Sequence, residues 1–183
     1  MIADFFQTDN FLSIEECEEL KRYSVKKLKN SSLVGEFDYS IRKHKSFFIL
    51  NNSQLDPLLR EILEKVKWKI RKVSSEYFKC DLCSTEPALF SRYQKGDFFN
   101  WHLDAGPKQN RDISASIFLD DPSTYKGGEF EFRDIFLASP TPSQGSLIVF
   151  PSLLSHRISE VQEGTRNALI VWSSRTEPTF QNL

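Results

Sequence analysis

The pattern of apolar residues changes about halfway along the chain. From residue 88 onward, short runs rich in β-branched and aromatic residues alternate with Gly, Pro, Asn and Asp. Such runs are typical of strands joined by turns, and several in succession indicate a sandwich or a barrel. We therefore expect strands over residues 88–93, 100–104, 113–119, 129–132, 146–150 and 166–172.

The first half of the chain carries helical signals instead. A capping box at Ser13 and Glu16 predicts a helix that ends near Leu28. Over residues 55–78, apolar residues recur at the spacing of an amphipathic helix with one buried face, and a helix of this kind packs on a sheet.

Two N-terminal segments have weaker patterns. Residues 2–6 are expected to form a first strand, whereas residues 30–45 are polar and rich in turn formers. His44 lies there between two lysines, and we expect it to be exposed to solvent.

We interpret the chain as one domain over residues 1–183, because no repeat, low-complexity segment or linker interrupts it. Residues 1–84 would give mainly helical support, and residues 85–174 would form a β core. The fold class is thus mostly β with α, and a jelly roll is the leading candidate. Sixteen phenylalanines suit the broad interior of such a fold.

Composition limits the partners and the compartment. Lysine plus arginine total 24 and aspartate plus glutamate total 25, so a net charge of -1 gives no reason to expect a nucleic acid or an anionic membrane as partner. We expect no signal peptide, and no apolar run is long enough to span a bilayer. Three cysteines, an odd number, indicate a reducing compartment, with the cytoplasm as the default.

Cys80 and Cys83 form a Cys-x-x-Cys pair. A structural zinc site needs further ligands at suitable spacing, so we interpret the pair as ordinary thiols, with a zinc or redox role as the weaker alternative.

His102 and Asp104 are candidate metal ligands, because side chains at i and i+2 project from the same face of a strand. The pair alone is weak evidence. His156, just past an apolar strand, is the candidate third ligand. Two histidines and one carboxylate are the ligands of non-haem iron(II) oxygenases, since dioxygen and a bidentate co-substrate need open positions. A zinc site, or unconnected polar residues at strand ends, would fit the same residues.

Arg166 opens the last predicted strand and shares a face with Ala168, Ile170 and Trp172 by alternation. A guanidinium on an otherwise apolar face needs an anion, and it suits a carboxylate because it can donate two parallel hydrogen bonds. Without the candidate metal ligands, a surface arginine at a strand start would be the simpler interpretation.

The segment Tyr93-Gln-Lys-Gly-Asp-Phe-Phe-Asn-Trp-His102-Leu-Asp104 resembles the Y-x-x-G-x-x-(F/Y)-x-x-H-x-D signature of 2-oxoglutarate/iron(II) dioxygenases of the prolyl-4-hydroxylase type. The segments 111–129, 145–157 and 164–172 resemble the strands, glycine turn and distal half that follow it. The set is most similar to the bacterial PKHD-type hydroxylases and covers residues 85–174 closely. A chain of motifs in the right order is a strong signal.

The resemblance implies a distorted double-stranded β-helix flanked by N-terminal helices, with Fe(II) as cofactor and 2-oxoglutarate as co-substrate. It also implies ascorbate as a candidate reductant. The implied residues are His102, Asp104 and His156 for the metal, Arg166, Tyr93 and Ser116 for 2-oxoglutarate, and Arg111 and Trp172 for the substrate.

The implied reaction hydroxylates an unactivated C–H bond, consumes dioxygen and yields succinate and carbon dioxide. The substrate would be a prolyl or other residue of a protein or peptide, or a small molecule. Three alternatives stay open: a non-catalytic cupin-like metal-binding or interaction module, a small-molecule hydroxylase, and a zinc hydrolase. The zinc hydrolase is disfavoured because no His-Glu-x-x-His motif occurs.

Overall fold

The computed structural model describes residues 5–30, 41–107, 109–133, 135 and 140–176. Within these ranges the chain forms two α-helices, one 3-10 turn and fourteen short strands. The helices are α1 (Ile14–Val25) and α2 (Pro57–Glu76), and the 3-10 turn covers Pro122–Thr124. The strands are β1 (Phe6–Thr8), β2 (Lys29–Asn30), β3 (Arg42–Lys43), β4 (Lys45–Ile49), β5 (Ser84–Thr85), β6 (Ala88–Gln94), β7 (Phe98–His102), β8 (Ile113–Phe118), β9 (Lys126–Gly127), β10 (Phe130–Phe132), β11 (Leu147–Pro151), β12 (His156–Ile158), β13 (Val161–Glu163) and β14 (Thr165–Ser174).

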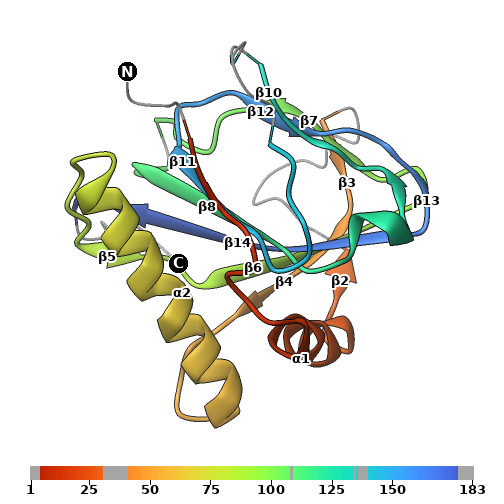
Figure 1. The fold of residues 1–183 in the computed structure, drawn as a ribbon, viewed down its shortest axis with the longest axis horizontal. Helices are drawn as coiled ribbons and strands as arrows, with labels where there is room; N and C mark the ends of the chain where they lie inside the picture. Colours follow the sequence, from red (N-terminus) through yellow and green to blue (C-terminus); the bar gives the residue numbers. More distant parts are fainter. Residues whose placement is uncertain (1–4, 31–40, 108, 134, 136–139, 177–183) are drawn as a thin grey trace.

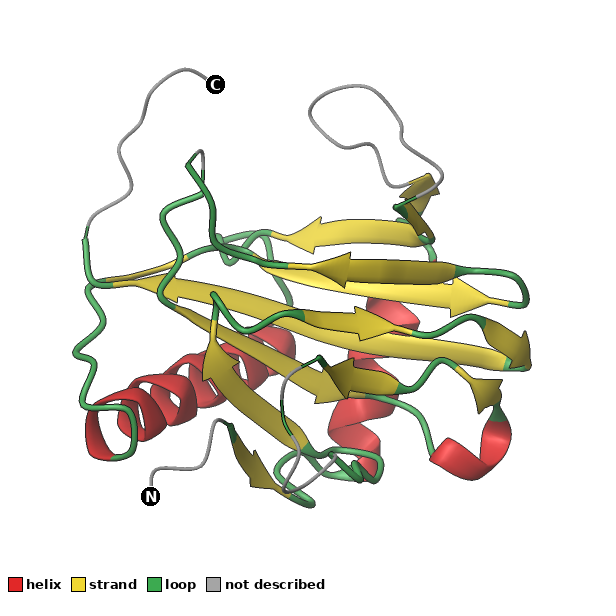
Figure 2. Ribbon diagram, turned by 90° about the horizontal axis from the view of Figure 1, so that it is seen from above, coloured by secondary structure: helices red, strands yellow, loops and turns green. Residues whose placement is uncertain are grey.

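The strands are organised in two sheets and one short ladder (Figure 2). The larger sheet has the order β1-β11-β8-β14-β6-β4-β2, with β5 also paired to β14, and the smaller sheet has the order β10-β12-β7-β3. Strands β13 and β9 form the ladder. The pairings within both sheets are antiparallel.

Both helices lie on the same side of the larger sheet (Figure 1). The buried stripe of α2, which includes Leu59, Val66 and Ile70, joins Phe90 and Leu169 of the sheet in one hydrophobic cluster. Helix α1 contributes buried residues to the same cluster. Its N-terminus has the predicted capping box, in which the Ser13 side chain accepts from the Glu16 amide and the Glu16 carboxylate accepts from the Ser13 amide.

The opposite face of the larger sheet builds a second, aromatic cluster with the smaller sheet. Strand β11 shows the division, because Leu147 and Val149 belong to the helix-side cluster whereas Ile148 and Phe150 belong to the aromatic one. This alternation follows from the two-residue period of a strand. Since both faces are buried, β11 carries a continuous apolar run, and every residue of β8 is buried, including Ser114 and Ser116.

The predicted elements are present, with boundaries shifted by a few residues. The two helices and all six strands predicted from residue 88 onward occur. The first strand begins at Phe6, and residues 2–4 of the predicted strand lie outside the described residues.

The polar segment 30–45, for which the sequence predicted no strand, contains β3; β2 ends at its first residue and β4 begins at its last, while residues 31–40 lie outside the described residues. The N-terminal part therefore does more than support the core, because β4 pairs with β6 in the larger sheet and β3 pairs with β7 in the smaller one. These pairings are made by backbone groups, which an irregular side-chain pattern does not reveal.

In the part of the chain that the structure describes, no helix combines the length and the hydropathy needed to cross a bilayer. Cys80 and Cys83 are free thiols there, and the metal-binding group identified among the described residues does not include them.

The buried stripe of α2 gives a stability prediction. Replacing Ile70, which is 1% exposed, with alanine leaves a cavity between the helix and the sheet and should lower the free energy of unfolding by about 2–5 kcal/mol. The same substitution at Ile14, which is 62% exposed, should change it by less than about 0.5 kcal/mol. Urea unfolding followed by circular dichroism measures both, and equal losses would contradict the assigned core.

Candidate metal centre

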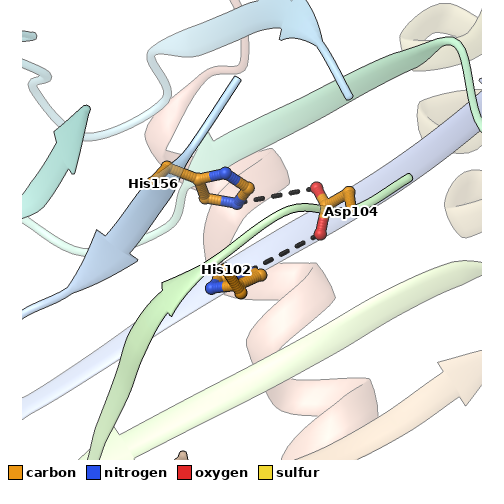
Figure 3. A group of neighbouring side chains, drawn as sticks. All are labelled: His102, Asp104 and His156. Carbon is orange, nitrogen blue, oxygen red and sulfur yellow. Dashed lines mark ion pairs between the residues drawn. The ribbon is translucent and has the colours of Figure 1, made fainter. Parts of the chain in front are cut away.

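The two predicted histidine ligands face each other across paired strands of the smaller sheet. His102 ends β7 and His156 begins β12, and the two residues are direct partners in the antiparallel register. Asp104 lies just beyond β7, where the amides of Asp104 and Ala105 both donate to the carbonyl oxygen of Ser152 at 3.0 and 3.1 Å. These hydrogen bonds hold the carboxylate between the imidazoles (Figure 3).

The three side chains converge through specific atoms. Nε2 of His102 lies 3.6 Å from Oδ1 of Asp104, and Nε2 of His156 lies 3.6 Å from Oδ2. Their candidate ligand atoms all lie within 4.8 Å of one another. The sequence analysis placed Asp104 by strand alternation. Because Asp104 lies past the end of β7, its position depends instead on the backbone hydrogen bonds to Ser152.

Both imidazoles are oriented toward Asp104 by a hydrogen bond from Nδ1 to a backbone carbonyl oxygen. Nδ1 of His102 donates to the carbonyl oxygen of Asn100 at 2.7 Å, and Nδ1 of His156 donates to that of Leu154 at 2.9 Å. A hydrogen bond from one ring nitrogen fixes the tautomer and leaves the other nitrogen free to bind a metal. The register of the two strands shifts next to these residues, because His156 pairs with His102 whereas Ile158 pairs with Phe99.

The Asp104 carboxylate is kept in its charged form although it is buried. Burial alone would raise the pKa of this group, but hydrogen bonding and charge from His102, the charge of His156 and the hydroxyl of Ser114 outweigh burial and hold the pKa well below its usual range. Ser114 donates to Oδ2 of Asp104 at 2.7 Å and also contacts the hydroxyl of Ser152 at 2.8 Å.

The imidazoles lie in an aromatic environment. The His102 ring stacks on Phe99 with centroids 3.5 Å apart, and the His156 ring meets Phe150 edge-on at 4.8 Å. Burial lowers the pKa of His156 to about 4, against the opposing charge of Asp104. A neutral imidazole is the form that binds a metal ion.

These residues fit a divalent metal ion of the iron type. Two imidazole nitrogens and one carboxylate supply three ligands on one side of the ion and leave positions open for other molecules. A metal ion bound by these ligands would also compensate the buried negative charge of Asp104, which is costly to bury without an opposite charge.

The predicted co-substrate residues line the same cavity as the metal group. Arg166 and Tyr93 are direct partners in the pairing of β14 with β6, and both are nearly completely buried. The cavity between the two sheets is lined by Arg42, His44, Tyr93, Phe99, His102, Asp104, Ser116, His156, Arg166, Ile170, Trp172 and further apolar residues.

The Arg166 guanidinium has donors with no partner. Arg166 is only 1% exposed, and its Nε and Nη2 atoms are buried without a hydrogen bond. The neighbouring backbone makes room for it at Gly128, where φ is +68° and an added Cβ would lie 3.0 Å from the Arg166 Cδ and 2.9 Å from Val161. Buried donors of this kind are rare without a partner, so an anion belongs beside Arg166.

The remaining predicted residues divide into two groups. Ser116 and Trp172 line the cavity, and burial raises the pKa of the Tyr93 phenol to about 12, so this hydroxyl stays protonated. Arg111 is not among the lining residues. Its guanidinium lies 3.8 Å from the centre of the Trp172 ring and donates from Nε and Nη2 to the two carboxylate oxygens of Glu86 at 2.6 and 2.7 Å.

The expectation that His44 is exposed was wrong, since it is 7% exposed and lines the cavity. Its ring stacks on Tyr93 at 4.7 Å and on Phe99 at 5.9 Å, so it fills the place where the chain passes from β3 to β4. Burial lowers the pKa of His44 to about 3. The two flanking lysines indicated that His44 is exposed to solvent. The signal for burial was its position two residues after Arg42, because side chains at this spacing lie on the same face of an extended strand.

An antiparallel two-sheet fold with two histidines and one carboxylate in its cavity defines a class of non-haem metal oxygenases, and the comparisons agree. Residues 88–174 match the model of the 2OG-Fe(II) oxygenase superfamily. A PKHD-type hydroxylase from Shewanella sp. (strain ANA-3) is 37% identical over 93 residues, which cover 47% of this chain and 42% of the relative. A PKHD-type hydroxylase from Xanthomonas campestris pv. campestris (strain B100) is 32% identical over 144 residues, covering 70% and 63%.

Solved structures resemble the whole fold. A Pseudomonas putida prolyl-4-hydroxylase matches with a TM-score of 0.76 at 20% identity, covering 96% of this chain and 94% of that one. A prolyl hydroxylase from Trichoplax adhaerens, in complex with a peptide fragment of hypoxia inducible factor, matches with a TM-score of 0.75 at 15% identity, covering 94% and 84%. At these identities the likeness concerns the fold.

Residues 88–174 therefore belong to the 2OG-Fe(II) oxygenase superfamily; they are similar in sequence to PKHD-type hydroxylases and share the fold of prolyl hydroxylases. Fe(II) and 2-oxoglutarate are the cofactor and co-substrate by which this superfamily is defined. The matched segment spans less than two thirds of the length of the curated relatives.

The hydrogen bond from Ser114 to Asp104 gives a prediction for metal binding. Replacing Ser114 with alanine should weaken Fe(II) binding about 10–100-fold, because the carboxylate loses the group that orients it. Ser173 is a matched control, since it is equally buried but bonds Thr85, and its alanine variant should bind Fe(II) normally. Anaerobic Fe(II) titration measures both, and an unchanged affinity in the Ser114 variant would contradict the assignment.

Proposed function

We propose that this chain is an Fe(II)- and 2-oxoglutarate-dependent dioxygenase that hydroxylates an unactivated C–H bond. The observation that carries the proposal is one cavity that holds both a three-ligand metal group and a buried guanidinium with two donors that lack a hydrogen-bond partner. A metal-binding module without turnover has no use for such a guanidinium, so the cupin-like alternative is disfavoured.

Each residue has a role in the proposal. His102, Asp104 and His156 hold Fe(II), and Arg166 binds the distal carboxylate of 2-oxoglutarate with its free donors. When bound, the metal and co-substrate supply the oxidising chemistry, in which dioxygen and 2-oxoglutarate give succinate, carbon dioxide and one hydroxyl on the substrate.

The other cavity residues position groups and exclude water. The protonated Tyr93 hydroxyl donates to the same distal carboxylate, and Ser116 lines the pocket beside it. The aromatic rings around His102 and His156 keep the cavity dry, which strengthens every electrostatic interaction within it. Trp172 forms part of the wall, with Arg111 behind its ring.

The fold and domain proposals extend the same reading. We infer that the two sheets form a distorted double-stranded β-helix, which the likeness to prolyl hydroxylase structures supports. We also infer one domain over residues 1–183, because β4 and β3 join the sheets that carry the site. A reducing compartment such as the cytoplasm stays a prediction from the three cysteines.

A peptide or protein substrate is one proposal, since the structural neighbour from Trichoplax adhaerens holds a peptide and its name is that of a prolyl hydroxylase. A small molecule is the second. Leu103, which lies between His102 and Asp104 in the chain and is 50% exposed, is an apolar side chain that suits contact with either.

Reconstitution tests the proposal directly. Anaerobic addition of Fe(II) and 2-oxoglutarate should produce the weak visible metal-to-ligand charge-transfer band of a 2-oxoglutarate chelate, and air should then yield succinate. Replacing His156 with alanine should remove both signals, because it deletes one of three ligands. The Leu153→Ala variant in the same loop is the control and should keep them. Succinate formation by the His156 variant would show that the third ligand is misassigned.

A second test separates co-substrate binding from metal binding. Replacing Arg166 with glutamine should weaken 2-oxoglutarate binding about 100-fold, or ~2.7 kcal/mol, since charge-assisted hydrogen bonds are lost, while Fe(II) binding stays within about threefold. The Arg175→Gln variant, which removes an arginine paired with Asp112 on the surface, should leave both affinities unchanged. Equal losses of metal and co-substrate binding by the Arg166 variant would overturn its role.

A further inference from the structure

A second guanidinium lines the cavity and has no role in the reaction as proposed. Arg42 belongs to β3, the edge strand of the smaller sheet, and pairs with Phe99 of β7. Its guanidinium carbon lies 5.5 Å from the centre of the Phe99 ring, which in turn stacks on His102. The Phe99 ring therefore contacts both Arg42 and the metal-ligand candidate His102.

Among the described residues, no carboxylate pairs with Arg42. Burial lowers its pKa, and the one group that opposes this effect is the Tyr93 phenol. Other arginines near the cavity differ, since Arg111 is paired with Glu86 and Arg157 with Glu131. An arginine stays protonated in proteins, so Arg42 brings to the cavity wall a half-buried positive charge that no described carboxylate pairs with.

Arg42 and Arg166 lie on different walls of the cavity. Arg166 comes from the larger sheet, 5.5 Å from the centre of the Tyr93 ring, whereas Arg42 comes from the smaller sheet. His44 stacks between Tyr93 and Phe99 and so fills the space between the two walls. The two guanidinium groups thus come from different sheets, although both act on Tyr93 and His44.

The charges of the cavity leave one of these groups unmatched. Apart from the histidines, the charged side chains that line the cavity are Asp104, Arg42 and Arg166. Resting on the proposed function, Fe(II) adds two positive charges and 2-oxoglutarate adds two negative ones. The loaded cavity then keeps one net positive charge, which a bound anion would neutralise.

We propose that Arg42 binds a carboxylate of the substrate, so that the substrate class is a carboxylate-bearing amino acid or peptide. A planar guanidinium supported on an aromatic ring presents two parallel donors, which match a carboxylate. The carboxylate is either the α-carboxylate of a free amino acid or chain end, or an acidic side chain next to the reacting residue.

Matched pairs of acids and amides test this. The anaerobic protein with Fe(II) and saturating 2-oxoglutarate is titrated with N-acetyl-L-proline and N-acetyl-L-prolinamide, and with the peptides Ac-Glu-Pro-NH₂ and Ac-Gln-Pro-NH₂. Binding is read from the shift of the charge-transfer band. We expect one acid to bind at least tenfold more tightly than its uncharged partner, and the pair that shows the preference identifies which carboxylate is bound.

Variants assign the preference to Arg42. Arg42→Gln should abolish it, Arg42→Lys should keep part of it, and both should bind 2-oxoglutarate as the parent does. Arg133→Gln is the control for net charge, because Arg133 is exposed and outside the cavity lining. It should keep the full preference.

Three results would overturn the inference. The first is no preference for the acid in either pair, and the second is loss of the charge-transfer band on adding the acid, which means that the acid competes with 2-oxoglutarate. The third is weaker 2-oxoglutarate binding by Arg42→Gln, which would show that Arg42 binds the co-substrate. Failure to form any charge-transfer band in the parent protein would instead contradict the proposed function. The two failures are therefore distinguishable.

Discussion

The antiparallel pairing of β7 with β12 is the interaction on which the site depends. It places His102 directly opposite His156, although 53 residues separate them in the chain. The backbone carbonyls of Asn100 and Leu154 then turn both imidazoles inward. Because a slip of one residue would move a side chain to the other face of the sheet, the register of this pair determines whether a metal group exists at all.

The larger sheet makes this arrangement stable by burying both of its faces. Its helix side holds an aliphatic cluster, whereas its other side holds the aromatic cluster that surrounds the metal group. Polar groups in such an interior are costly unless they are paired. The structure satisfies the Asp104 carboxylate through the Ser114 hydroxyl and the His102 imidazole, but it leaves two donors of Arg166 unsatisfied. This contrast separates the groups that maintain the site from a group that requires a ligand.

Sequence reasoning predicted the parts of the fold that local patterns encode. The capping box at Ser13, the stripe of α2 and the alternation of β14 from Arg166 to Trp172 are all local, and each is present. Strands β2 and β3 were missed, because two-residue strands are defined by backbone pairing with distant segments. The burial of His44 was missed for the same reason, since its aromatic neighbours come from β6 and β7.

The candidate site shows the same limit in finer detail. The ligand types of the metal group could be predicted from spacing and from the family resemblance, but the register shift beside His102 and the Ser152 carbonyl that holds Asp104 could not. Those features depend on which segments meet in space. Gly128 could be predicted only in part. Its positive φ could be expected from a glycine in a turn, whereas its close approach to the Arg166 side chain could not.

The position of Arg42 suggests how chemistry and specificity are divided in this fold. His102, His156 and Arg166 lie on strands with partners on both sides, where a substitution disturbs two pairings. Strand β3 is an edge strand that contributes two residues, so the side chain at position 42 can change with little effect on the core. A charge on this strand contacts the cavity without supporting the metal ligands. Selection among substrates can therefore be altered at the edge of the smaller sheet while the reaction centre stays intact.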